Sequence, residues 1–257
     1  MDRLYRLAQA GETFHAVERD GQLRRAILEH GDVFGGYRLG DPVGGGLAAS
    51  RVLAPVVPRK IVCVGLNYKD HATEVGKKLP PEPLLFFKPT TAVIGPGDTI
   101  RLPPGVGRVD YEAELAIVIG RRAHRVPAAR ALDHIFGATC LNDVTARDMQ
   151  NKEPQYTRCK SFDTFAPLGP SIVTGFDLAP RAVEAWVNGQ RRQASSTSKL
   201  IFPIDHLVEY ITFVMTLEPG DVISTGTPPG IGPLEPGDVV TVKVEGVGEL
   251  SNPVADE

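Results

Sequence analysis

The sequence lacks any long hydrophobic run. No apolar stretch approaches the ~20 residues that a membrane-spanning helix needs, and the start, MDRLYRLAQAGE, lacks the apolar segment of a secretory signal peptide. An excess of one charge is also absent, because 28 Lys and Arg stand against 31 Asp and Glu, for a net charge of −3. We therefore expect no partner among nucleic acids or membrane surfaces.

Cysteine is scarce as well. Cys63, Cys140 and Cys159 are odd in number, scattered along the chain and in no C-x-x-C pattern. Such usage is typical of reduced thiols in a cytosolic protein. We expect a cytoplasmic location and assign these cysteines no chemistry.

Glycine and proline, in contrast, are abundant. The 27 glycines and 22 prolines make about 19% of the 257 residues, below the ~25–30% that suggests disorder. Short strands joined at Gly11 and at the hairpin dipeptide Asp20-Gly21 are predicted first, followed by a Gly/Pro-rich connector. We place a boundary near residues 50–58, between a small N-terminal β domain (1–55) and a main domain (56–257).

The main domain alternates between strand and helix signals. Runs rich in β-branched and aromatic residues predict strands, and apolar residues at helical spacing predict helices. The predicted strands are 60–65, 83–89, 91–95 and 137–144, with a hairpin over 182–195 that turns at Asn188-Gly189. The predicted helices are a short one over 67–75, one over 126–137 with a Gly stop, and an amphipathic one over 203–215 that opens at Pro203. The fold class is therefore α+β, dominated by strands.

A short pattern occurs three times, as GPGDTI (95–100), EPGDVI (218–223) and EPGDVV (235–240). Pro-Gly predicts a turn with positive φ at the glycine, and the residues that follow the aspartate begin a strand. The unequal spacings favour shared turn chemistry over a repeat architecture.

DYEAELAIVIG (110–120) has the pattern of a strand that contains two glutamates. Because strand residues two apart share a face, Glu112 and Glu114 point the same way. A solvated face is the ordinary reading of an isolated E-x-E. Apolar residues continue both faces here, however: Ala116 and Val118 on the glutamates' face, and Leu115, Ile117 and Ile119 on the other. Burial on both sides favours glutamates that are compensated by basic side chains or by a cation such as Mg²⁺ or Mn²⁺.

A third oxygen ligand is needed for such a cation. Asp143 ends the apolar strand in LNDVTARDMQ, where a helix could begin. It could be that ligand or it could cap the helix, and both readings stay open. Arg147, four residues later, could pair with it.

His71 and Glu74 lie three residues apart in GLNYKDHATE. If the segment is helical they share a face, and the carboxylate would raise the basicity of the imidazole, as in a general base. A pair on the protein surface is the competing interpretation.

Two lysines and one loop are the remaining candidates for a functional role. Lys88 and Lys160 lie among apolar or aromatic residues at strand ends, where a lysine either extends its ammonium to solvent or neutralises an anion. In STGTPPGIG (224–232), backbone N–H groups and the Thr227 hydroxyl could bind a carboxylate or enolate. This loop is no phosphate loop, because it has neither G-x-x-x-x-G-K-[ST] nor G-x-G-x-x-G.

Taken together, these stretches resemble the fumarylacetoacetate hydrolase superfamily over about residues 60–235. The resemblance rests on motifs that occur in this order: GLNYKDHATE, FFKP, GPGDTI, DYEAELAIVIG, NDVTARDMQ, CKSFDTFAPLGP, NGQRRQASSTSKLIF and LEPGDVISTGTPPGIGP. One departure is TSKLIF, where related sequences often read closer to TSxMIF; it concerns substrate fit near Lys199 and Leu200.

The resemblance implies a mixed β-roll fold, a homodimer and a catalytic domain over 56–257, with a small N-terminal domain as in some bacterial members. It implies Mg²⁺ or Mn²⁺ held by Glu112, Glu114 and Asp143. It further implies that His71 and Glu74 together form the general base and that Lys160 is catalytic. The residues implied to bind substrate are Lys88, Arg147, Gln150 and Thr227.

The chemistry that the resemblance implies is that of 2-oxo acids or their enols, through an enolate. We expect a 2-hydroxyhepta-2,4-diene-1,7-dioate isomerase or a related decarboxylase of aromatic catabolism. An acylpyruvate hydrolase or an oxaloacetate decarboxylase is the alternative, and a non-catalytic binding protein is a remote one.

Overall fold

The computed structural model describes residues 1–74, 76 and 78–257, and of residues 71–73 it describes the backbone only. The strands are β1 (Arg3–Gln9), β2 (Glu12–Arg19), β3 (Gln22–Leu28), β4 (Tyr37–Pro42), β5 (Arg51–Leu53), β6 (Ile61–Gly65), β7 (Leu84–Lys88), β8 (Val93–Ile94), β9 (Ile100–Leu102), β10 (Val109–Tyr111), β11 (Ala113–Ile119), β12 (Ile135–Asn142), β13 (Thr145–Ala146), β14 (Ala166–Thr174), β15 (Ala182–Val187), β16 (Gln190–Ser196), β17 (Val222–Ser224), β18 (Gly232–Pro233), β19 (Val239–Val244) and β20 (Gly248–Asp256). The α-helices are α1 (Lys69–Glu74), α2 (Arg147–Lys152), α3 (Thr157–Lys160) and α4 (Ile204–Val214), and short 3-10 helices span Leu47–Ala49, Thr90–Ala92, Ala128–His134 and Thr197–Lys199. The predicted strand-dominated α+β class is confirmed.

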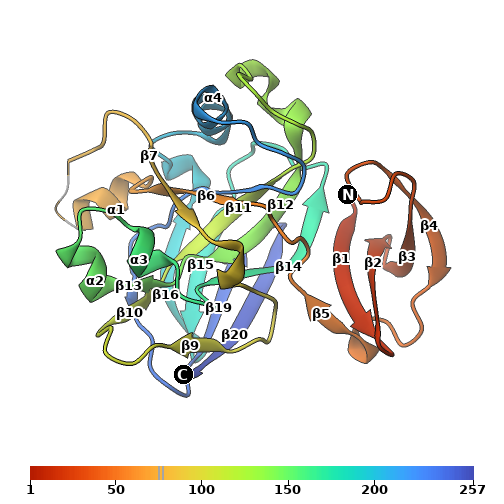
Figure 1. Cartoon of the computed structure of the whole chain (residues 1–257), viewed down its shortest axis with the longest axis horizontal. Coiled ribbons are helices and arrows are strands. Elements are labelled where there is room, and N and C mark those ends of the chain that lie inside the picture. Colours follow the sequence, from red (N-terminus) through yellow and green to blue (C-terminus); the bar gives the residue numbers. More distant parts are fainter. Residues whose placement is uncertain (75, 77) are drawn as a thin grey trace.

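The largest sheet follows the order β4-β3-β2-β1-β14-β12-β11-β17-β6-β7, with β5 paired to β1 and β8 to β14. A second sheet has the order β16-β15-β19-β20-β9, and a small third sheet joins β13, β10 and β18. In Figure 1, β1 to β4 lie at the right beyond β14, whereas α1, α2 and α3 lie at the left. The sheets are mixed, because β17 runs parallel to β6, while β11 runs antiparallel to both of its neighbours.

Strand β11 is buried on both faces, as its sequence pattern predicts. Leu115, Ile117 and Ile119 belong to the larger hydrophobic cluster, and Ala116 and Val118 belong to a second cluster across the sheet. The solvated-face reading of the two glutamates is thereby excluded, since Glu112 and Glu114 are only 5% and 2% exposed. Their charges must be compensated inside the protein.

The predicted turns are confirmed. Strands β2 and β3 pair around Asp20-Gly21, and β15 and β16 pair around Asn188-Gly189, with positive φ at all four turn residues. The three Pro-Gly-Asp turns share one further contact, which the aspartate makes through its side chain. Asp98, Asp221 and Asp238 each accept a hydrogen bond from the backbone N–H three residues earlier.

One predicted helix is wrong in type and length. Only the 3-10 helix Ala128–His134 forms within 126–137, and β12 already begins at Ile135. Ile135 pairs with Ile119 of β11. The apolar residues at the end of this pattern therefore lie in a strand and not in a longer helix. The helix expected over 203–215 is confirmed as α4, with Pro203 at its N-cap.

The N-terminal unit, residues 1–55, continues the main sheet. Strand β1 pairs with β14 through Leu4 and Ile172, and Leu4 and Val17 belong to the second hydrophobic cluster. Tyr5, Leu7, Ala16 and Val43 form a small cluster within the unit. The predicted division at residue 55 stays a prediction, because this unit has apolar contacts of its own and also shares a core with the rest.

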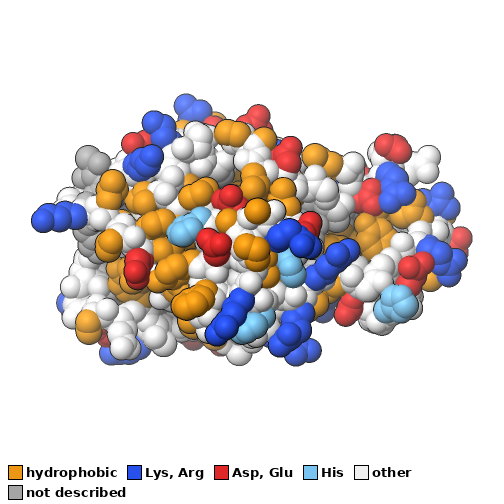
Figure 2. Space-filling view, turned by 90° about the horizontal axis from the view of Figure 1, so that it is seen from above, with side chains coloured by type: hydrophobic (Ala, Val, Ile, Leu, Met, Phe, Trp, Pro, Cys, Tyr) orange, Lys and Arg blue, Asp and Glu red, His pale blue; other side chains and the backbone are white. Residues whose placement is uncertain are grey.

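Side chains of both charges lie on the face of the molecule seen in Figure 2. On the face drawn in Figure 2, acidic and basic side chains are interspersed over the N-terminal unit and over the rest of the molecule. None of the helices in the described residues has the length and apolar character that crossing a bilayer requires.

Candidate metal centre

Three carboxylates meet where β10 and β12 end and β11 begins. Glu112 occupies the break between β10 and β11, Glu114 lies in β11, and Asp143 follows β12 directly. The pairing of β11 with β12 brings them together, and the Asp143 N–H donates to the Glu112 carbonyl at 2.9 Å. One carboxylate oxygen from each residue lies within 4.8 Å of the other two, and all three residues are buried.

Asp143 does not cap the helix that follows it. Helix α2 begins four residues later, at Arg147, with no side-chain cap among the described residues. The Asp143 carboxylate instead accepts hydrogen bonds from Lys88 Nζ and Lys160 Nζ, each at 2.5 Å. The cap reading is thereby excluded, and Asp143 lies in the cluster of charged groups; its role as a metal ligand stays a prediction.

Both lysines are buried and neutralise anions. The side chains of Lys88 and Lys160 are 0% and 2% exposed, so neither extends its ammonium to solvent. Lys160 also donates to Glu112 Oε2 at 2.9 Å. Burial alone would lower the pKa of Lys160, but the charges of Asp143 and Glu112 raise it overall. In the metal-free cluster the two carboxylates therefore favour the protonated form of Lys160.

Arg147 pairs with Asp110 and Glu112 instead of Asp143, the partner that the sequence suggested. Its Nε donates to Asp110 Oδ2 at 2.8 Å, and its terminal nitrogens donate to Glu112 and Gln150. The reason is local, because β13, which leads into α2, pairs with β10 and sets Asp110 opposite Thr145. Burial opposes the charge of Arg147, yet Glu112 and Asp110 raise its pKa.

Asp110 is a site residue that sequence reasoning missed. It is fully buried and also accepts hydrogen bonds from Arg108, whose Nε lies 2.6 Å from Oδ1. Its position two residues before Glu112 was the available signal, since residues two apart tend to share a strand face. Asp110 thus anchors the guanidinium that contacts Glu112.

The two glutamates differ in their compensation. Burial would raise the pKa of Glu112, but Lys160 and Arg147 hold it well below its usual range. Burial, together with the nearby charges of Asp143 and Glu112, raises the pKa of Glu114 to about 8. Both hydrogen bonds that Glu114 accepts among the described residues come from neutral donors, Ser224 Oγ and, at 2.8 Å, the Gly226 N–H.

The loop 224–232 therefore binds a carboxylate, but that carboxylate belongs to the protein. Besides its contact with Glu114, the loop donates the Gly230 N–H to Glu74 Oε1 at 2.9 Å. The Thr227 hydroxyl donates to the Ala113 carbonyl at 3.0 Å and accepts from Gln193 Nε2 at 2.9 Å. The substrate contact predicted for Thr227 stays a prediction, and the hydroxyl proton is already used.

The structure describes the predicted pair of His71, the general base, and Glu74 only in part. The segment that carries it forms α1, as expected, and Glu74 lies exposed at the end of this helix. The side chain of His71 lies outside the described residues, so its contact with Glu74 stays a prediction. The contact between Glu74 and Gly230 places the end of α1 beside the loop 224–232.

A cavity of about 160 Å³ opens on these groups. Seven of the predicted site residues line it: Glu112, Glu114, Asp143, Arg147, Gln150, Lys160 and Thr227. Lys88 is not among the lining residues and contacts Asp143 and the Val144 carbonyl instead. The roles assigned to these residues stay predictions, but the structure does bring the residues together.

The residues fit a divalent cation. Carboxylate oxygens are the ligands that hard cations such as Mg²⁺ and Mn²⁺ prefer. Among the described residues Glu114 accepts hydrogen bonds from neutral donors only, and burial with the charges of Asp143 and Glu112 outweighs the charge of Lys160 in raising its pKa. The three carboxylates can therefore hold a metal ion, and a bound cation would favour the ionised form of Glu114.

Known proteins are similar to this chain in sequence and in fold. The family profile described as "Fumarylacetoacetate (FAA) hydrolase C-terminal" matches residues 60–255. A solved structure from Mycobacterium marinum, named 2-hydroxyhepta-2,4-diene-1,7-dioate isomerase, is 43% identical with a TM-score of 0.91, over 100% of this chain and 99% of that one.

Two further relatives carry names of enzymes. A solved structure from Mycobacterium smegmatis, named 5-carboxymethyl-2-hydroxymuconate delta-isomerase, is 46% identical with a TM-score of 0.88, over 99% of both chains. A mitochondrial oxaloacetate tautomerase of Xenopus laevis is 42% identical over 216 residues, which are 79% of this chain and 68% of that protein. The predicted superfamily and its fold are thus confirmed.

Proposed function

The chain belongs to the fumarylacetoacetate hydrolase family, and from this premise we propose that it is a divalent-metal-dependent enzyme acting on 2-oxo acids or their enols through an enolate. The observation that carries the proposal is the buried triad of Glu112, Glu114 and Asp143, in which Glu114 has no cationic partner among the described residues. Mg²⁺ is the proposed cation and Mn²⁺ the alternative.

The reaction we propose is a proton shift. The named relatives include two isomerases and a tautomerase, and each of these names describes an interconversion of isomers without loss of carbon. The first candidate is the isomerisation of 2-hydroxyhepta-2,4-diene-1,7-dioate or a related dienedioate, with decarboxylation as an associated outcome. The second candidate reaction is the tautomerisation or decarboxylation of oxaloacetate. The small cavity of about 160 Å³ is compatible with such a short acid.

A cation bound by the triad supplies Lewis acidity that stabilises the enolate. The protein contributes fixed positive charge, because the Lys160 ammonium lies between Glu112 and Asp143 at the cavity. Arg147 is held by Asp110 and faces the same cavity. These two cations attract the carboxylates of a dianionic substrate and orient it. His71, oriented by Glu74, would move the proton between carbon and oxygen.

The test is a substrate panel followed by absorbance and product analysis. Protein stripped with a chelator is mixed with oxaloacetate, acetylpyruvate or the dienedioate, and Mg²⁺ or Mn²⁺ is then restored. We expect turnover to disappear with the chelator and return with the metal. A full rate in chelator would contradict the proposal, and metal-dependent binding without turnover would identify a binding protein.

The His71→Ala variant separates the possible outcomes. Loss of hydrolysis with retained decarboxylation would assign His71 to the activation of water, as in an acylpyruvate hydrolase. NMR in D₂O measures proton exchange at the carbon next to the oxo group. Loss of this exchange in the variant would assign His71 to the proton shift. The expected result is the second.

We also propose, from the family resemblance, that the protein forms a homodimer. Light scattering of the purified protein measures the mass directly. The mass of a single chain, 27.7 kDa, would contradict this part of the proposal.

A further inference from the structure

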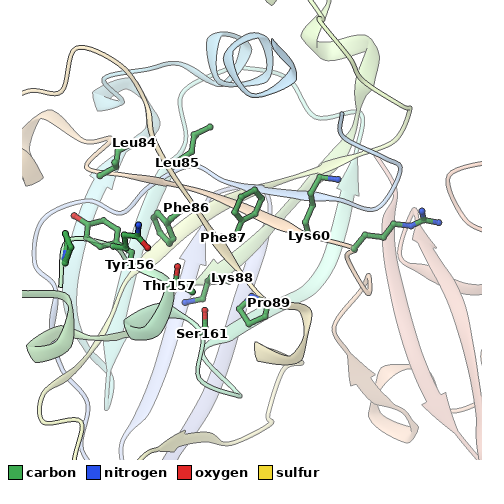
Figure 3. Close-up of a pocket in the computed structure, with 13 residues that line it drawn as sticks. Lys60, Leu84, Leu85, Phe86, Phe87, Lys88, Pro89, Tyr156, Thr157 and Ser161 are labelled. Atoms are coloured by element: carbon green, nitrogen blue, oxygen red, sulfur yellow. The ribbon is translucent and has the colours of Figure 1, made fainter. Parts of the chain in front are cut away.

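A second and larger cavity lies beside the candidate metal centre. It measures about 710 Å³ and extends along β7, the outer strand of the main sheet (Figure 3). Most of its lining from β7 and the residue after it is apolar: Leu84, Leu85, Phe86, Phe87 and Pro89. We call this cavity the β7 groove, and the smaller one the metal-site cavity.

Two aromatic side chains separate the cavities. Of the described residues, Phe86 and Tyr156 are the two that line both. Phe86 comes from β7, and Tyr156 directly precedes α3, so the pair bridges two elements that are distant in the sequence. Figure 3 draws the two rings next to each other at one end of the groove.

The ring pair is packed rather than loosely arranged. The centroids of Phe86 and Tyr156 lie 5.6 Å apart with an interplanar angle of 79°, the edge-to-face geometry that aromatic pairs favour. The Lys160 Nζ atom lies 5.0 Å from the centroid of the Phe86 ring. Phe86 therefore contacts the charged site as well as the apolar groove.

The sizes of the two cavities indicate how the Phe86–Tyr156 pair limits a bound substrate. The metal-site cavity of about 160 Å³ is smaller than the ~300–1,000 Å³ of most ligand pockets, whereas the β7 groove falls within that range. The metal-site cavity has room for a carboxylate, an oxo group and a few carbons. An apolar tail that extended toward β7 would meet the rings of Phe86 and Tyr156.

We propose that the Phe86–Tyr156 pair determines the substrate chain length by closing the metal-site cavity toward the β7 groove. In the wild-type protein the two rings keep a straight apolar tail out of the β7 groove, and opening the pair lets such a chain of several carbons enter it. The inference rests on the proposed function, since it assumes that the 2-oxo acid head binds at the metal centre.

The test measures binding rather than turnover. Calorimetry in the presence of Mg²⁺ gives the affinities of pyruvate, 2-oxohexanoate and 2-oxooctanoate for the wild type, Phe86→Ala and Tyr156→Ala. We expect affinity to fall with chain length in the wild type. In each variant we expect the ratio of 2-oxooctanoate to pyruvate affinity to rise by at least about tenfold, since a single methylene in an apolar pocket can contribute that much.

Two matched variants serve as controls. Tyr156→Phe keeps the ring pair, and Phe87→Ala removes a neighbouring ring that lines the β7 groove but not the metal-site cavity. Both should retain the wild-type preference for chain length. Because Phe86 and Tyr156 are altered separately, a variant that fails to fold leaves the other to decide.

The outcomes are distinguishable. A wild type that binds 2-oxooctanoate as tightly as pyruvate overturns the inference, as does an unchanged ratio in a folded Phe86→Ala or Tyr156→Ala variant. In both cases pyruvate binding is intact and the proposed function stands. A wild type that with Mg²⁺ binds no acid of this panel, and neither oxaloacetate nor the dienedioate in the same assay, overturns the proposed function and this inference with it.

Discussion

The candidate metal centre and the N-terminal unit both carry ion pairs, but in different surroundings. Lys88 and Asp143 form a pair whose side chains are 0% and 1% exposed, whereas those of Arg25 and Glu12 in the N-terminal unit are 39% and 59% exposed. Their distances are similar, at 2.5 and 2.8 Å. The difference therefore lies in the solvent around the charges and not in the length of the contact.

Burial changes what an ion pair means. An exposed pair gains little from its contact, because water and salt screen the charges. A buried pair has lost its hydration, so removing one partner leaves a charge that nothing compensates. The cluster of charges around Asp143 is consequently a place where single substitutions should have large effects, and the N-terminal surface is not.

The largest effect on metal binding and turnover is expected at a proposed metal ligand. Glu112→Gln keeps the side-chain size and removes the charge, so divalent-cation affinity should fall by about 10–100-fold or more, and turnover should fall with it. Titration calorimetry with Mn²⁺ measures the affinity. Glu12→Gln, the same change on the N-terminal surface, is the control, and equal losses in the two variants would refute the contrast.

The next effect concerns stability without metal. Lys88→Met removes a cationic partner of Asp143 and should lower the free energy of unfolding by about 3–5 kcal/mol, measured by urea denaturation in chelator. Lys243→Met, which removes one partner of the exposed pair with Glu249, should leave the midpoint unchanged. If Lys88→Met were no more harmful than this control, the cluster would not depend on its lysines.

A third prediction uses pH. The pKa of Glu114 rises from 4.5 to about 8 on folding without metal, through burial and the charges of Asp143 and Glu112, partly offset by Ser224 and Lys160. A raised carboxyl pKa contributes stability below the unfolded pKa, and this contribution is lost as pH rises through the folded one. The metal-free protein should therefore lose roughly a few kcal/mol relative to Glu114→Gln between pH 5 and 9.

Urea midpoints for both proteins across this pH range give the comparison, and titrations that the two share cancel in the difference. Added Mg²⁺ should flatten the difference, because a bound cation favours the ionised carboxylate. A difference that grows in favour of the wild type as pH rises would contradict the sign.

The smallest effect is expected on the surface. Glu12→Gln breaks the exposed pair with Arg25, which still lies 3.9 Å from the centroid of the Phe14 ring. The thermal midpoint should stay within the scatter of replicates at low and high salt, as scanning calorimetry can show. A decrease comparable to that of Lys88→Met would mean that the N-terminal unit depends on its surface charges.

Much of the site could be predicted from local patterns. Strand periodicity placed Glu112 and Glu114 on one buried face, and the Pro-Gly-Asp turns and hairpin dipeptides were placed correctly. The partners of the carboxylates could not be read in this way. Lys88 lies 55 residues from Asp143, and Ser224 lies 110 residues from Glu114.

The sequence by itself indicated that two carboxylates lie close together in a buried strand segment, because alternation in a strand depends only on neighbouring residues. The structure interrupts this segment at Glu112, between β10 and β11. The tertiary structure decided which groups compensate the two carboxylates. Pairing of β10 with β13 directed Arg147 to Asp110 rather than Asp143, and pairing of β11 with β12 joined Asp143 to the glutamates. Strand register sets such contacts, and register depends on the packing of the whole sheet.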